Sequence, residues 1–196
     1  MRKAIEHLKS ADPVLAQIID RVGAFKMQYR EPTFEGLARS IVYQQLSGKA
    51  AGTIYGRVLE ACGGQMTPPG VLALTPERMR ELGLSKQKSA YLRDLAEKTA
   101  SGELDFNAFA DMADEDVIEH LTQVKGIGVW TVHMFLMFYL RRPNVLPTGD
   151  LGIRNAIKRA YRMRKDPKPA DIERIARKWH PYCSVASWYM WRSLEP

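Results

Sequence analysis

Apolar residues recur at helical spacing along nearly the whole chain of 196 residues. Residues 13–22 and 34–45 follow the i, i+3, i+4, i+7 pattern of a helix that buries one face. No segment alternates apolar and polar residues as a half-buried strand does, and no internal repeat is present. We therefore predict an all-α fold of about ten helices. Further helices are expected after Ser47 and Ser85, in a short segment from Thr75 to Gly83, and over 114–124, 129–140, 151–163, 170–179 and 184–194.

The connections between the predicted helices are mostly short, which favours a single domain over residues 1–196. The proline-rich stretch 65–70 is interpreted as a loop. If a cleft divides the chain, this loop and the segment 141–149 are the expected borders.

The chain is basic, with 29 Lys and Arg against 22 Asp and Glu and a net charge of +7. Such a balance favours a polyanionic partner, although a basic protein without one is equally consistent with charge alone. Cys62 and Cys183 form no C-x-x-C pair, and the four histidines show no metal-binding spacing. This excludes a cysteine-ligated cluster or zinc ribbon, and we expect no catalytic metal and no cofactor.

The first residues, MRKAIEHLKSADP, lack the apolar segment of a signal peptide. The longest apolar run, 129–140, is interrupted by Thr131 and His133 and is too short to span a bilayer. We therefore expect a soluble intracellular protein without a membrane partner, located in the cytoplasm or nucleoid if the chain is bacterial.

A tight turn, Gly126-Ile127-Gly128, separates the helical patterns 114–124 and 129–140. Glycines let the main chain approach an anion closely, because no Cβ stands in the way. On a basic chain, that anion is expected to be a DNA phosphate. The alternative is an ordinary glycine turn beside a solvated helix face.

Several segments in chain order resemble the helix–hairpin–helix (HhH-GPD) superfamily of base-excision DNA glycosylases, in its 3-methyladenine DNA glycosylase II form. The resemblance covers roughly residues 34–194, with the helix–hairpin–helix motif at about 114–140, and leaves no room for the N-terminal α/β lobe of longer bacterial members. It implies a compact, two-lobed helical fold with a cleft between the lobes. The matching segments are 34–47 (FEGLARSIVYQQLS), 82–88 (LGLSKQK), 91–96 (YLRDLA), 124–131 (VKGIGVWT) and 179–184 (WHPYCS).

Asp150 is the expected catalytic residue, because the family pattern places an aspartate after the hairpin and a loop. Cleavage of a base–sugar bond develops positive charge on the deoxyribose, which a carboxylate stabilises. The same carboxylate can orient or deprotonate the attacking water. Asp150 also precedes a predicted helix, so it is a good N-cap, and the two roles are compatible.

Trp130 decides the predicted subclass. Bifunctional relatives resembling endonuclease III carry a lysine at this position, whose amine forms a Schiff base with the sugar. Trp130 predicts a monofunctional enzyme that leaves the strand uncut. Trp130 and Tyr182 are expected to line the base pocket, where stacking and a cation–π interaction of about 0.5–2 kcal/mol suit a positively charged alkylated purine. Core packing is the alternative for both, and it is the expected role of Trp179, Trp188 and Trp191.

The remaining candidate residues would contact DNA. Flipping a base leaves a gap, and Gln45 or Leu46 lies where the family places the residue that fills it. Gln45 has an alternative role in bracing its helix. A monovalent cation at the hairpin, between the main chain and the phosphate, is left open. The hairpin contacts are expected from Lys125, Gly126, Ile127, Gly128 and Thr131, with further phosphate contacts from Lys158, Arg159, Arg162 and Arg164.

The residues and the resemblance together imply a monomeric, monofunctional DNA glycosylase of base-excision repair that acts on alkylated purines in double-stranded DNA. The substrates expected from the resemblance are 3-methyladenine and, less specifically, 7-methylguanine or 1,N6-ethenoadenine. The alternative is a non-catalytic helix–hairpin–helix DNA-binding module.

Overall fold

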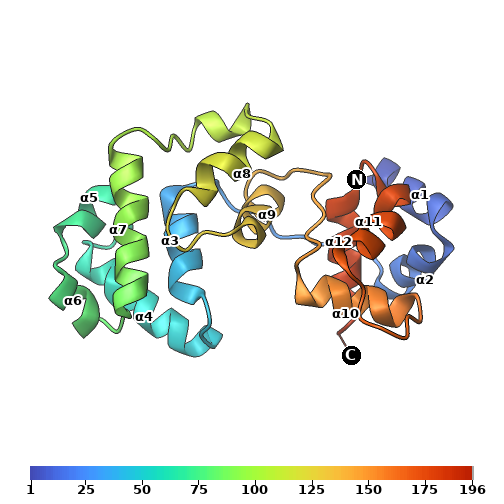
Figure 1. The fold of residues 1–196 in the computed structure, drawn as a ribbon, viewed down its shortest axis with the longest axis horizontal. Coiled ribbons are helices and arrows are strands. Elements are labelled where there is room, and N and C mark those ends of the chain that lie inside the picture. The colour runs from blue at the N-terminus through green and yellow to red at the C-terminus, as the bar shows by residue number, and fades with distance from the viewer. Residues whose placement is uncertain (196) are drawn as a thin grey trace. The chain divides into compact units, whose positions relative to one another are not determined.

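The computed structural model describes residues 1–195, in which twelve α-helices and two short 3₁₀ helices follow one another (Figure 1). No strand occurs in these residues, so the all-α prediction is confirmed. The chain divides into two compact units, each described by itself below. One unit is Arg30–Phe135, and the other combines Met1–Tyr29 with the chain from Leu136 onward.

The unit Arg30–Phe135 is built around the long helix α7, which packs against α3, α5 and α6. Figure 1 shows α7 as the long green helix beside them. Its core includes fully buried Leu37, Ile41, Leu92, Leu95 and Phe109. The elements are α3 (Phe34–Tyr43), α4 (Gly48–Ala61), α5 (Pro68–Ala73), α6 (Pro76–Glu81), α7 (Lys86–Ala100), η1 (Ala108–Ala110), α8 (Asp114–Thr122) and the first part of α9 (Val129–Phe138).

The second unit surrounds α12, which is buried from Cys183 to Met190 and packs against α1, α2 and α10. Burial on all sides explains why α12 is apolar or small at most positions rather than on one stripe. The elements are α1 (Arg2–Ala11), α2 (Pro13–Val22), α10 (Leu151–Ala160), α11 (Pro169–Ala176), η2 (Arg177–Trp179) and α12 (Cys183–Arg192).

The borders between the units differ from the expected ones. They fall at Tyr29–Arg30 and at Phe135–Leu136, within α9, and not at 65–70 or 141–149. The stretch 65–70 is also not wholly a loop, because α5 begins at Pro68. Proline is compatible with the first helical turn, whose N–H groups have no partner within the helix, and the Thr67 side chain accepts a hydrogen bond from Gly70 N.

Most predicted helix starts are confirmed by their caps. The Ser47, Thr75 and Ser85 hydroxyls accept hydrogen bonds from main-chain N–H groups three residues later. Helix α10 ends earlier than expected, at Ala160 and not at residue 163. Arg162, which follows this end, has a left-handed φ of 52°. Helix α1 was not predicted. Within the described residues, no helix is both long and apolar enough to cross a membrane.

Asp12, fully buried between α1 and α2, forms hydrogen bonds to several elements of the second unit. Its Oδ1 caps α2 by accepting from Val14 N and Leu15 N. Its Oδ2 accepts from the Tyr161 hydroxyl and, at 2.8 Å, from Trp179 Nε1. Lys178 Nζ lies 3.1 Å from Oδ1. One carboxylate therefore joins the α1–α2 junction to the end of α10 and to η2.

Candidate functional site

The predicted hairpin lies between α8 and α9 as expected. Gly126 has a φ of +80°, and a Cβ there would overlap the ring of Tyr91 from α7. The Ile127 side chain is only 4 % exposed, so any contact of this residue with DNA would be made by its main chain. The hairpin thus presents backbone rather than side chains, next to the first-turn N–H groups of α9.

We expect Gly126→Ala to displace the hairpin and to destabilise the protein by about 1–3 kcal/mol, because the new methyl group meets Tyr91 and the positive φ disfavours alanine. Gly128→Ala is the matched control, since a Cβ at Gly128 meets nothing within 4 Å. Urea unfolding of both variants measures the difference. Equal stability of the two variants would contradict the packing of Tyr91 on Gly126.

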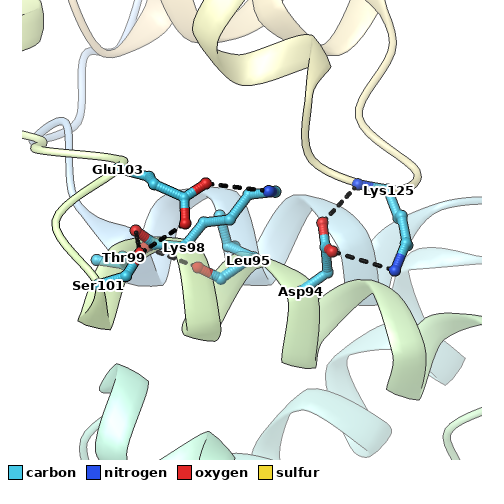
Figure 2. Close-up of polar contacts among 7 residues, drawn as sticks. All are labelled: Asp94, Leu95, Lys98, Thr99, Ser101, Glu103 and Lys125. Carbon is cyan, nitrogen blue, oxygen red and sulfur yellow. Dashed lines mark hydrogen bonds and ion pairs between the residues drawn. The ribbon is translucent and has the colours of Figure 1, made fainter.

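Lys125, a predicted DNA contact, is held by Asp94 of α7. Figure 2 shows both contacts: Lys125 N donates to Asp94 Oδ2 at 2.9 Å, and Lys125 Nζ lies 3.3 Å from Asp94 Oδ1. The Lys125 side chain is still 70 % exposed. Asp94 therefore fixes the start of the hairpin and leaves the ammonium open to solvent.

Residues 44–46, which we call the wedge turn, connect α3 to α4. Gln45 is exposed and has a φ of 56°, and Leu46 is 39 % exposed. Gln44 Nε2 donates to Gly126 O at 2.9 Å, so the wedge turn and the hairpin are directly bonded. Both candidate gap-filling side chains are accessible.

A pocket of about 670 Å³ lies where the wedge turn, α7 and the hairpin meet. Trp130, half exposed at the start of α9, lines it together with Thr131, whose side chain is largely buried. The structure thus brings Gln45, Gly126, Trp130 and Thr131 to one hollow of this unit. The complete lining is Ser40, Tyr43, Gln44, Gln45, Ser85, Gln87, Lys88, Tyr91, Gly126, Trp130, Thr131 and Met134.

Asp150, in the other unit, caps α10 as the sequence suggests. Its Oδ1 accepts from Ile153 N at 2.8 Å and from Trp191 Nε1 at 2.8 Å. The residue is only 9 % exposed. A Cβ at Gly152 would lie 2.8 Å from the Trp191 ring and 3.0 Å from Asp150 Oδ1, so glycine permits this approach. The carboxylate is held in one orientation by two donors.

Trp191 is the functional candidate that sequence reasoning missed, because it was assigned to packing alone. It does pack, stacking on Phe138 with ring centroids 6.0 Å apart, but its N–H also orients Asp150. Tyr182 instead occupies the N-cap position of α12 without a side-chain capping bond, and its ring contacts the His7 ring. Tyr182 and Trp191 are nine positions apart in the chain, about 13 Å along the helix axis. The structure brings Trp191 to Asp150, and a role of Tyr182 in a base pocket stays a prediction.

We expect Trp191→Phe to keep the ring stacked on Phe138 and to lower base release about tenfold, because the hydrogen bond to the carboxylate is lost. Trp188→Phe, on the same helix but packed against Phe25, is the control and should release base normally. Single-turnover release measures both. An unchanged rate in Trp191→Phe would show that Asp150 does not depend on this indole.

The basic residues in the last turn of α10 and directly after it are only partly gathered. Lys158 Nζ lies 2.7 Å from Asp166 Oδ1, whereas Arg159 and Arg162 line a hollow of about 240 Å³ with Arg21. Arg164 is exposed. Cationic side chains also complement the C-terminal end of α10, so this position needs no ligand to explain it. Among residues 1–195, no three His, Cys, Asp or Glu side chains are grouped so that they could hold a metal ion.

Comparison with known proteins identifies the class. Residues 38–181 match the family model described as HhH-GPD superfamily base excision DNA repair protein. The chain belongs to this superfamily, as the ordered motifs indicate.

Individual relatives narrow the comparison. The chain is 36 % identical over 200 residues to DNA-3-methyladenine glycosylase 1 of Schizosaccharomyces pombe, covering 98 % of this chain and 87 % of that protein. It is 38 % identical over 168 residues to a putative DNA-3-methyladenine glycosylase of Bacillus subtilis, covering 81 % of this chain but only 58 % of the relative.

Solved structures agree with this comparison. A DNA-3-methyladenine glycosidase of Bacillus halodurans superposes with a TM-score of 0.88 at 37 % identity, covering 96 % of this chain and 87 % of that one. The S. pombe 3-methyladenine DNA glycosylase in complex with abasic DNA gives a TM-score of 0.84 at 36 % identity, covering 96 % and 95 %.

Proposed function

We propose that this chain is a monofunctional DNA glycosylase that hydrolyses the N-glycosidic bond of alkylated purines in duplex DNA. The orientation of Asp150 by Trp191 and Ile153 N carries the proposal. A buried N-cap aspartate alone would be structural. The additional hydrogen bond from the tryptophan N–H fixes the orientation of this carboxylate. In a chain of this superfamily, we expect a carboxylate held in this way to stabilise a sugar cation.

In the proposed reaction, the bond between C1′ and the purine nitrogen breaks with its electrons leaving on the base. The deoxyribose gains positive charge, which the Asp150 carboxylate stabilises electrostatically. A water oxygen attacks C1′, and its proton passes to Asp150 or to solvent. Alkylation at N3 or N7 already makes the base a good leaving group, so no general acid is required.

Trp130 supports the monofunctional assignment. A strand-cutting relative would need an amine at this position to form a Schiff base with the sugar. The half-exposed indole of Trp130 instead offers an aromatic face to a cationic base. The products are therefore a free base and an abasic site in an uncut strand.

Double-stranded DNA is the proposed partner, and the protein is proposed to act as an intracellular monomer without a cofactor. The backbone surface of the hairpin and the exposed Lys125 ammonium suit phosphates, which fix position without reading sequence. A monovalent cation between the hairpin and the phosphate remains part of the proposal. The S. pombe relative, solved with abasic DNA, gives a precedent for this partner.

The substrate range is tested with a panel of duplexes, each with one lesion: 3-methyladenine, 7-methylguanine or 1,N6-ethenoadenine. We expect 3-methyladenine to be released, and the panel shows which of the other two bases is released as well. Binding of every duplex with release of none would contradict the enzyme and support a non-catalytic DNA-binding module.

A further inference from the structure

Lys88, in the first turn of α7, makes two contacts that neither the sequence patterns nor the proposed chemistry account for. Its Nζ donates to Val42 O and to Gln44 O, both at 2.7 Å. These carbonyls lie at the C-terminal end of α3, where main-chain oxygens lack helical partners and a cation is favoured. Partial burial removes water from this ammonium and lowers its pKa, and the two carbonyl oxygens take the place of that water.

The segment that Lys88 holds is the wedge turn. Gln45 adopts a left-handed φ of 56°, which a residue with a side chain keeps only when its surroundings fix it. Lys88 binds the carbonyl directly before Gln45, and the Gln44 side chain binds Gly126 O. The conformation that exposes Gln45 and Leu46 is therefore anchored on both sides of Gln44.

The same helix also holds the hairpin. Tyr91 packs against Gly126, and Asp94 binds both the N–H and the ammonium of Lys125. Lys88, Tyr91 and Asp94 follow one another at intervals of three residues, so they lie on neighbouring turns of α7. One rigid helix thus sets the wedge turn and the phosphate-facing hairpin at a fixed separation.

We propose that Lys88 is a positioning residue for base flipping, which holds the wedge turn in the conformation that fills the gap left by the flipped base. The proposal rests on the proposed glycosylase function and adds a residue that acts through the main chain of the wedge turn. Its loss should hinder extrusion of a paired base and leave the bond-breaking step intact.

Two substrates separate flipping from chemistry. One carries 3-methyladenine opposite thymine, and the other carries it opposite an abasic site, where no base pair must be broken. For Lys88→Met we expect single-turnover release from the paired lesion to fall about 10–100-fold. This is the size of effect expected when hydrogen bonds from a charged group are lost. Release from the unpaired lesion should fall less than about threefold.

Lys86→Met is the matched control, because Lys86 is exposed and lies two residues before Lys88 on the same helix. This variant should release base from both substrates at the normal rate. Lys88→Arg keeps the charge and the donors and should recover most of the paired-lesion rate. If Lys88→Met melts well below the unaltered protein, Lys88→Gln, which keeps one amide donor, replaces it in the comparison.

The outcomes are distinguishable. An equal loss on both substrates, or no loss on the paired lesion, would overturn the role of Lys88 while leaving the glycosylase intact. Failure of the unaltered protein to release base from either duplex would instead overturn the proposed function, and the positioning role with it.

Discussion

Asp150→Asn should fold normally and lose base release by about 10²–10⁴-fold. Asparagine is as good an N-cap as aspartate, and its amide oxygen can accept the same two hydrogen bonds from Ile153 N and Trp191 Nε1. The substitution therefore removes the negative charge with little change in geometry. Release of 3-methyladenine from a defined duplex under single-turnover conditions measures the loss.

Thermal melting and DNA affinity serve as controls for this variant, and both should match the unaltered protein. A melting temperature lowered by several degrees would show that the charge matters to the fold rather than to the reaction. Release at a near-normal rate by a well-folded Asp150→Asn would exclude Asp150 as the catalytic group.

Asp12→Ala should cost about 3–5 kcal/mol of unfolding free energy, the largest stability effect that we expect from one polar side chain. Removing the carboxylate uncaps α2 and leaves the N–H of buried Trp179 without its acceptor. Asp20→Ala is the matched control on the same helix, because its ion pair with Lys9 is exposed and worth at most about 1 kcal/mol. Urea unfolding compares the two variants.

The same carboxylate sets a pH dependence. Burial by itself would raise the pKa of Asp12, but hydrogen bonds from Tyr161, Trp179 and Lys178 outweigh it and hold the pKa below the usual 3.8. The stabilisation is therefore complete above the unfolded-state pKa and is lost as pH falls through the lower folded-state pKa.

The unfolding free energies of the unaltered protein and of Asp12→Asn should differ by a constant amount above about pH 5 and converge in stronger acid. A difference that grows as the pH falls would contradict this assignment.

Much of the fold could be predicted because its signals are local. Ser47 and Ser85 cap the helices that follow them, and the hairpin lies between two helices as its glycines indicate. Helix α5 escaped prediction because Pro68 and Pro69 suggest a loop, although a first helical turn tolerates both. The borders of the two units depend on contacts between distant segments, which helical periodicity does not encode.

The candidate site was predictable only in part, for the same reason. Asp150 and Trp130 stand in motifs that can be recognised along the chain. Trp191 lies 41 residues from Asp150, and the helical pattern of α12 gives no sign that one indole N–H meets a carboxylate. Lys88 lies 44 residues from Gln44 in the chain. From the sequence alone, this lysine would be interpreted as an exposed residue on a helix surface.

The most direct test of the central claim follows both products on one duplex with a single 3-methyladenine, incubated with the unaltered protein and borohydride. We predict a free base, an abasic site in an intact strand and no protein–DNA adduct, because Trp130 stands where a Schiff-base lysine would be needed. Strand cleavage with a borohydride-trapped adduct, or no free base at all, would contradict the account.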